Sequence, residues 1–213
     1  MSTVIASVDR RSPAQLAGIK PGEQLLTING HEIIDVLDYR FYGYDADSHL
    51  TLREPNGAQR AVHIRKQEGQ DLGLNFDTYL MDEMRSCANH CIFCFVDQMP
   101  PGMRQTLYFK DDDARLSFLL GNYITLTNLT EREAQRIIDL HICPINVSVH
   151  TTDPQLHCTM LGNKNAGRSL EYIRAFCKAG IVMNGQIVIC PGWNDGDQLR
   201  RTLRDLTDWE FSS

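Results

Sequence analysis

The stretch Cys87-Ala88-Asn89-His90-Cys91-Ile92-Phe93-Cys94 brings three cysteines within eight residues and is the most informative part of the chain for fold and function. Thiolates are soft ligands suited to zinc or to iron–sulfur clusters. A structural zinc site needs four ligands, whereas these spacings let one loop ligate three corners of a four-iron cluster. The fourth iron then stays open to a small chelating molecule. The loop therefore predicts metal ligands at Cys87, Cys91 and Cys94.

Two other interpretations of these cysteines stay open. They could bind structural zinc with His90 or His150 as the fourth ligand, although the chain lacks a second cysteine pair of the zinc-knuckle kind. They could also hold a cluster used only for electron transfer. A ferredoxin, however, supplies a fourth cysteine that proline usually follows, and Cys94 is followed by Phe95. Four further cysteines are scattered along the chain, and we expect them to be reduced thiols or core residues: Cys143, Cys158, Cys177 and Cys190.

The order Cys-x-x-x-Cys-x-aromatic-Cys, with Phe93 before the last cysteine, resembles the signature of the radical S-adenosylmethionine (SAM) superfamily. The resemblance implies a 4Fe-4S cluster, SAM, and an electron donor such as a flavodoxin or ferredoxin. In that superfamily the reduced cluster passes an electron to the sulfonium and yields a 5′-deoxyadenosyl radical that abstracts hydrogen from the substrate. The cofactors carry the difficult chemistry, while the protein orients them and excludes water.

Strands and helices alternate after the cysteine loop. Apolar periodicity predicts strands over residues 123–127, 145–149 and 185–189, and helices over 131–140, 169–178 and 198–209. Repeated units of this kind imply a parallel sheet with functional groups at the carboxyl ends of its strands. We therefore expect an α/β fold, a partial radical SAM β/α barrel, behind a small domain that is mainly β.

Polar residues at the ends of these strands are candidates for binding and catalysis. Where the superfamily has a Gly-Gly-Glu stretch, this chain has Leu126-Thr127-Asn128. The resemblance implies SAM contacts from four residues: Thr127, Asn128, Ser148 and Gln186. Two further strand-end residues, His150 and Cys190, are candidates for protonating a product or quenching a substrate radical. Each also fits a structural role, as a hydrogen-bonded histidine and a core cysteine.

Residues 1–70 predict a small domain. We expect strands over residues 4–8, 24–28, 49–54 and 60–65, a helix capped by Ser12, and helical spacing over 33–39. The run from Ser12 to Gly30 closely resembles the PDZ domain of bacterial proteases. This resemblance implies a protein partner whose C-terminal peptide adds as a strand, with its carboxylate held by a glycine-rich loop. Because no Gly-Φ-Gly-Φ loop occurs near the start, packing on a neighbouring domain is an equal alternative.

Longer stretches extend the resemblance over essentially the whole chain. Four stretches, together with the PDZ-like start, resemble the DUF512 family, which is described as iron–sulfur oxidoreductases: Cys91 to Gln98, Lys110 to Phe118, Gly121 to Asn128 and Ser148 to Thr152. We expect a PDZ-like domain over 1–70, a linker and first barrel strand over 71–86, and the partial barrel over 87–213. The superfamily's barrel usually has six strand–helix units and this chain has room for fewer. We therefore expect a truncated barrel whose last strand, near Gln186, has an unpaired edge.

Charge and hydropathy narrow the setting. Twenty-one basic and 27 acidic residues give a net charge of −6, and no Lys/Arg stripe of the kind that follows a phosphate backbone is present. No stretch approaches the ~18 apolar residues that span a bilayer, so we expect a cytoplasmic protein without membrane or nucleic-acid partners. The function expected is reductive cleavage of SAM, acting on a small-molecule or peptide-linked substrate. The alternative is a PDZ-type protein-binding module with a structural zinc or electron-transfer site.

Overall fold

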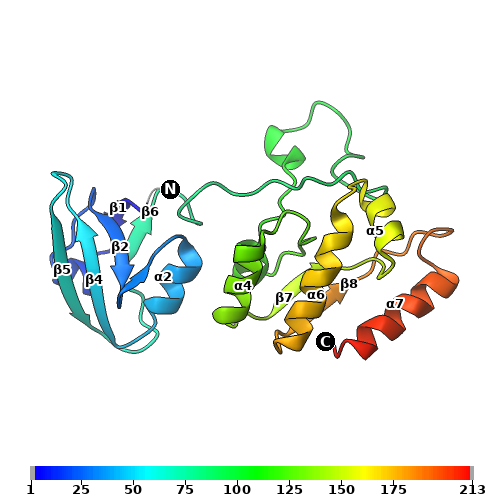
Figure 1. Ribbon diagram of the computed structural model, residues 1–213. Helices are drawn as coiled ribbons and strands as arrows, with labels where there is room; N and C mark the ends of the chain where they lie inside the picture. Colours follow the sequence, from blue (N-terminus) through cyan, green and yellow to red (C-terminus); the bar gives the residue numbers. More distant parts are fainter. Residues whose placement is uncertain (1–2, 212–213) are drawn as a thin grey trace. The chain divides into compact units, whose positions relative to one another are not determined.

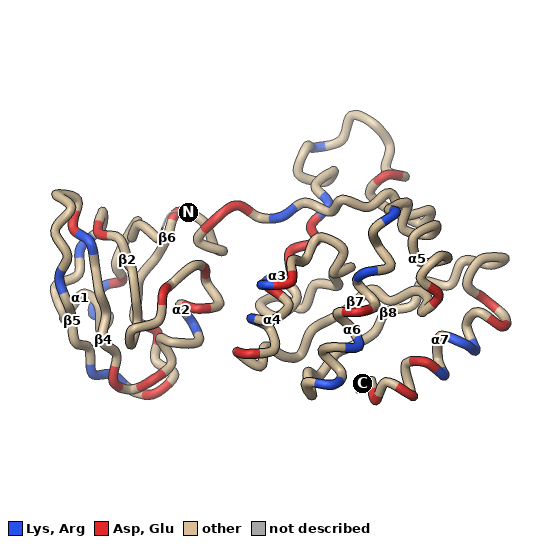
Figure 2. Tube along the Cα trace, viewed as in Figure 1, with Lys and Arg blue, Asp and Glu red and all other residues tan. Residues whose placement is uncertain are grey.

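The computed structural model describes residues 3–211, which form two units (Figure 1). The first unit ends at Met84 and the second begins at Arg85. Acidic and basic residues are interspersed along both units (Figure 2). Over the described range, no helix combines the length and apolar character needed to cross a membrane.

The N-terminal unit is built on antiparallel strands. One sheet has the strand order β3-β2-β4-β5, and β1 pairs with β6 in a second sheet. The elements are β1 (Ile5–Val8), α1 (Pro13–Leu16), β2 (Gln24–Ile28), β3 (His31–Glu32), α2 (Val36–Tyr42), β4 (Asp47–Arg53), β5 (Gln59–Arg65) and β6 (Leu74–Phe76).

The β4–β5 hairpin follows the period-two pattern expected from the sequence. Its two strands pair in continuous register from Asp47↔Arg65 to Arg53↔Gln59. Leu50 and Leu52 are buried on one face, whereas the alternating positions of both strands lie on the exposed face. The predicted hairpin is confirmed, and its register determines which polar side chains meet on the outside.

Capping residues decide where the two helices of this unit begin. The Ser12 hydroxyl accepts a hydrogen bond from the Gln15 N–H at 3.1 Å and starts α1, as predicted. The second helix starts later than its apolar spacing suggested. Asp35 adopts extended geometry and accepts from the Leu37 N–H at 2.9 Å, so α2 begins at Val36.

β6 corrects the prediction of a first barrel strand within residues 71–86. This strand pairs antiparallel with β1 and belongs to the N-terminal unit. Gly73 precedes it with a φ of +81°, and a Cβ there would lie 2.2 Å from the Ser12 Cβ. Only glycine fits so close an approach. The segment Leu72-Gly73-Leu74 therefore has a Φ-Gly-Φ pattern and lies against Ser12, although the two are about 60 residues apart in the sequence.

The C-terminal unit has a parallel pair of strands, β7 and β8, surrounded by helices. Its elements are η1 (Gln105–Tyr108), α3 (Ala114–Leu120), α4 (Glu131–Asp139), β7 (Ile145–Ser148), α5 (Pro154–Leu161), η2 (Ala166–Arg168), α6 (Ser169–Lys178), β8 (Met183–Gln186) and α7 (Gly196–Asp208).

Helix predictions in this unit hold better than strand predictions. Thr130 and Glu133 form a capping box at the start of α4. By contrast, only Ile124 of the predicted strand 123–127 pairs with β7, through Val147. The reason is local, because the Thr125 N–H donates to Asp112 and Leu126 has a φ of +60°.

The last strand is shifted toward the N-terminus of the segment predicted for it. β8 ends at Gln186 because the Val188 N–H donates to His150 Nδ1 and thus leaves the ladder. Within residues 3–211, β8 pairs with β7 alone, in agreement with the predicted unpaired edge. Phe211 packs over the strand: a Cβ on Gly185 would lie 3.1 Å from its ring.

Candidate functional site

The cysteine loop, residues 87–94, is held against the carboxyl end of α5 by its backbone. The His90 N–H donates to the Leu161 carbonyl at 2.8 Å, and the Ile92 N–H donates to Met160 at 2.9 Å. Gly162 follows with a φ of +58°, and a Cβ there would lie 2.4 Å from the His90 carbonyl oxygen. The loop can approach the helix this closely only because residue 162 is glycine.

A second attachment holds the start of the loop. The Cys87 N–H donates to the Lys110 carbonyl at 2.7 Å, and Ser86 forms an antiparallel bridge with Asp111. A tight turn follows, in which the Cys94 N–H donates to the Cys91 carbonyl at 3.0 Å. All three cysteine side chains are half-buried. The backbone hydrogen bonds therefore fix the loop that carries the three thiols.

Asn89, between the first two cysteines, joins the loop to residues 125–127 and to the turn after α5. It is 1% exposed. Its Nδ2 donates to the hydroxyls of Thr125 and Thr127 at 3.0 and 2.9 Å, and its Oδ1 accepts from Asn163 Nδ2 at 2.7 Å. A buried amide with every partner satisfied stabilises one loop conformation.

Burial and mutual repulsion disfavour free thiolates in this loop. Burial, with the adjacent Cys87 and Cys94, raises the pKa of Cys91 to about 12. The pKa of Cys87 is also raised, first by burial and then by Asp112. Lys110 opposes this effect, and its Nζ donates to the Asn89 carbonyl at 3.3 Å. A cationic metal centre would supply the charge that ionises the thiols.

An apolar wall lies beside the thiols. Met160, Leu161 and Ala166 form a buried group, and Cys91, Phe93 and Cys190 pack against it. The Phe93 ring contacts the His150 ring, with centroids 4.5 Å apart. The fold thus brings the two predicted strand-end candidates, His150 and Cys190, into the surroundings of the cysteine loop.

His150 is buried, with 2% exposure and a φ of +58°. Its Nδ1 accepts from the Val188 N–H at 3.2 Å, which assigns the proton of the neutral ring to Nε2. Burial, with a smaller contribution from His157, lowers the pKa of His150 to about 4. The ring is therefore neutral at pH 7.

Replacement of His150 should reduce the loss of folding free energy that the chain shows as the pH falls below 7. Because the folded-state pKa lies below the unfolded value of about 6.5, His150 contributes stability above that pH and loses it as the pH falls toward 4. Between pH 7 and pH 4 the wild-type chain should lose about 3 kcal/mol more than His150→Asn, as measured by urea unfolding of the C-terminal unit. His157, whose pKa burial also lowers, is retained in both chains.

His141 offers a matched control for this experiment. It is an exposed histidine with a similar backbone conformation, at a φ of +47°. His141→Asn should keep the pH dependence of the wild type. Parallel curves for the wild type and His150→Asn would contradict the account of His150.

The predicted SAM contacts occupy different surroundings. Thr127 bonds to Asn89, and Asn128 Nδ2 donates to the Ser86 carbonyl at 3.4 Å, so both lie beside the cysteine loop. Ser148 and Gln186 are partners in the β7–β8 register, with Ser148 buried and Gln186 exposed.

Several residues that shape the site escaped the sequence interpretation. Asn194 is fully buried, and its Nδ2 donates to the His150 and Val188 carbonyls at 2.8 and 2.9 Å. From the sequence, the segment that contains Asn194 predicts only a turn. Asn89 and Lys110 carried no signal beyond their nearness to cysteines or aspartates, because hydrogen bonds between distant segments leave no periodic pattern.

Binding of a single zinc ion by the cysteine loop would require its ligand atoms to move closer together. Tetrahedral zinc holds its sulfur ligands about 3.8 Å apart, as Zn–S bonds of ~2.3 Å require. Over residues 3–211, neither the three cysteines nor any set including His90 or His150 brings three ligand atoms within 4.8 Å of one another. Ligands of a cluster bind different irons and lie further apart than the ligands of a single ion.

The turn that leads into β6 is closed by side chains of its own unit. The Leu74 N–H donates to the Tyr39 hydroxyl at 3.3 Å, and the Gly73 N–H donates to the Asp71 carboxylate at 2.6 Å. A cavity of about 250 Å³ lies beside this turn, lined in part by Tyr39 and Asp71. Both N–H groups are therefore hydrogen-bonded within the unit.

Residues 66–212 match the family model described as a radical SAM-like domain. The chain belongs to the radical SAM-like domain family. Residues 4–53 match a PDZ domain model, and a comparison with curated proteins finds no match. The radical SAM-like match includes the whole cysteine loop and every strand-end candidate. It also includes β6, which folds with the N-terminal unit.

Proposed function

We propose that this radical SAM-like chain binds a 4Fe-4S cluster through Cys87, Cys91 and Cys94 and uses it in reductive cleavage of SAM. The narrower resemblance to DUF512 oxidoreductases belongs to the same proposal. The observation that carries it is the loop itself: three half-buried thiols lie on one short loop whose backbone hydrogen-bonds to Lys110, Met160 and Leu161. When bound, the cluster supplies the electron that breaks the C–S bond of SAM.

The surrounding residues have separate tasks in this proposal. Asn89 and Gly162 keep the loop in its ligand-presenting conformation, one by hydrogen bonds and the other by permitting close contact. The Phe93 ring and the buried group around Met160 keep water from one side of the thiols. Lys110 provides positive charge next to ligands that become anionic.

His150 and Cys190 are the proposed groups for later proton or hydrogen-atom transfer. His150 is neutral at pH 7 with its proton on Nε2, and Cys190 remains a thiol because burial raises its pKa. The His150 ring contacts Phe93, and Cys190 packs against the same apolar group as Cys91. Thr127 and Asn128 are proposed to contact SAM, because they lie beside the loop.

Incubation of the cluster-loaded chain with SAM and a low-potential reductant tests this function. We expect 5′-deoxyadenosine and methionine to form together, in amounts that depend on the reductant. Product measured by chromatography from the same chain without reductant provides the control. A fully loaded chain that releases no 5′-deoxyadenosine under reduction would contradict the proposal of catalysis.

A further inference from the structure

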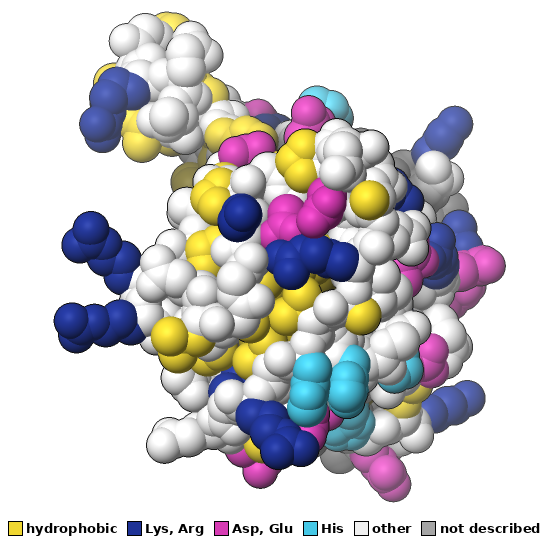
Figure 3. All heavy atoms as spheres, turned by 90° about the vertical axis from the view of Figure 1, so that its left-hand side faces the viewer, with side chains coloured by type: hydrophobic (Ala, Val, Ile, Leu, Met, Phe, Trp, Pro, Cys, Tyr) yellow, Lys and Arg dark blue, Asp and Glu magenta, His cyan; other side chains and the backbone are white. Residues whose placement is uncertain are grey.

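A second group of ligand-forming side chains lies on the N-terminal unit, apart from the cysteine loop in sequence. Asp47 and His49 are on β4, and His63 is on β5. All three belong to the exposed face of the hairpin, with side-chain exposures of 55%, 69% and 42%. Figure 3 shows histidine side chains gathered on one part of this unit's surface.

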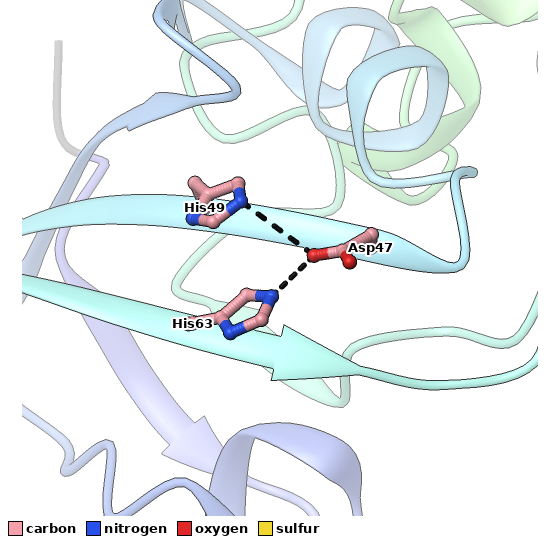
Figure 4. Close-up of side chains that lie close together, drawn as sticks. All are labelled: Asp47, His49 and His63. Atoms are coloured by element: carbon pink, nitrogen blue, oxygen red, sulfur yellow. Dashed lines mark hydrogen bonds and ion pairs between the residues drawn. The ribbon is translucent and has the colours of Figure 1, made fainter.

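The strand register brings the three side chains together. His49 and His63 are directly opposite each other, and Asp47 is two residues before His49 on the same face. The imidazole rings are stacked, with centroids 4.4 Å apart and planes 4° from parallel. Both Nε2 atoms face the Asp47 Oδ1: His63 hydrogen-bonds to it, and His49 lies 3.6 Å away (Figure 4).

Each residue offers one ligand atom, and the three atoms lie within 4.8 Å of one another. Two imidazole nitrogens and one carboxylate oxygen form a donor set that suits zinc and other first-row divalent ions. At Zn–N distances of ~2.0–2.1 Å, nitrogens bound to one ion lie about 3.3 Å apart. Because the nitrogen lone pairs lie in the ring planes, the two stacked rings must tilt toward the ion to bind it. Their exposure to solvent leaves room for this movement.

We propose that Asp47, His49 and His63 form a binding site for a divalent transition-metal ion, with Zn²⁺ as the representative ligand. The ion bridges β4 and β5, and water completes its coordination on the solvent side. The hydrogen bond from His63 lowers the pKa of Asp47, which keeps this carboxylate ionised at neutral pH. Binding to the folded hairpin stabilises the N-terminal unit, since the unfolded chain lacks the arrangement.

Arg65 competes with the ion for the same carboxylate. It lies opposite Asp47 in the register, and its Nε is 3.7 Å from the Asp47 Oδ2. A fixed positive charge near a divalent ion is repulsive even in water, although salt screens much of the effect. Arg65→Gln should therefore tighten zinc binding by about threefold.

The test is a zinc titration of the full chain against a competing chelator. Because thiols without a cluster are zinc ligands in their own right, Cys87, Cys91 and Cys94 are replaced by alanine in every variant. The parent should bind one Zn²⁺, and His63→Asn should weaken that binding by about tenfold or more. His31→Asn is the matched control, since His31 is an exposed histidine of the same unit that stacks on Tyr42 instead.

Equal zinc affinity of the His63→Asn and His31→Asn chains would overturn the site. Should the alanine background fail to fold, the same comparison is made with the cysteines present. The wild type must then bind one more equivalent of zinc than His63→Asn, and equal stoichiometry would contradict the proposal. Neither outcome depends on whether the cysteine loop binds a cluster.

Discussion

Cys91→Ala should lose the iron–sulfur cluster, the largest single effect expected for this chain. Three protein ligands are the whole set available from the loop, so a variant with two of them cannot hold the cluster tightly. Anaerobic reconstitution followed by iron and sulfide analysis should give about four irons per chain for the wild type and only a small fraction of that for Cys91→Ala. Production of 5′-deoxyadenosine should fall with the iron content.

Controls separate ligand loss from a packing defect, because Cys91 also packs against the group around Met160. Cys91→Ser retains nearly the same volume and should lose the cluster as well. Cys177→Ala removes a half-buried thiol from α6 and should keep full iron content. If Cys91→Ala and Cys177→Ala bind equal iron, Cys91 is not a ligand.

Gly162→Ala should unfold the attachment between the cysteine loop and α5. The added Cβ would lie 2.4 Å from the His90 carbonyl oxygen, and this neighbour is backbone that cannot swing away. The positive φ adds its own cost of about 1 kcal/mol for a residue with a side chain. We expect the free energy of unfolding to fall by about 3 kcal/mol or more, with a parallel loss of reconstituted iron.

Gly180 supplies the comparison for this variant. It follows α6 with a φ of +71°, but a Cβ there would meet nothing within 4 Å. Gly180→Ala should therefore cost about 1 kcal/mol, with iron content unchanged. Urea unfolding of both variants measures the difference. Equal destabilisation by the two substitutions would show that contact with His90 is unimportant.

Local patterns explain which parts of the fold were predictable. The hairpin of β4 and β5 has an alternating apolar face, and α4 has its capping box within four residues, so each carries its own signal. The prediction of a strand over residues 123–127 was wrong because contacts with a distant segment override the local signal. The β-branched residues of this segment favour a strand, but the hydrogen bonds of Thr125 to Asp112 and the positive φ of Leu126 interrupt the ladder.

The candidate site divides in the same way. Cysteine spacing identifies three thiols from sequence alone, because one loop carries them. The network around Asn89 joins residues 36 to 74 positions apart, which no single-sequence periodicity reveals. The Asp47, His49 and His63 group also needs the β4–β5 register, since a shift by one residue would put His63 on the buried face.

Electron paramagnetic resonance of the reduced, reconstituted chain, recorded before and after addition of SAM and combined with metal analysis, tests the central claim most directly. The account predicts about four irons per chain and a cluster signal that changes when SAM binds the open iron. Zinc in place of iron, or a cluster signal that SAM leaves unchanged, would contradict it.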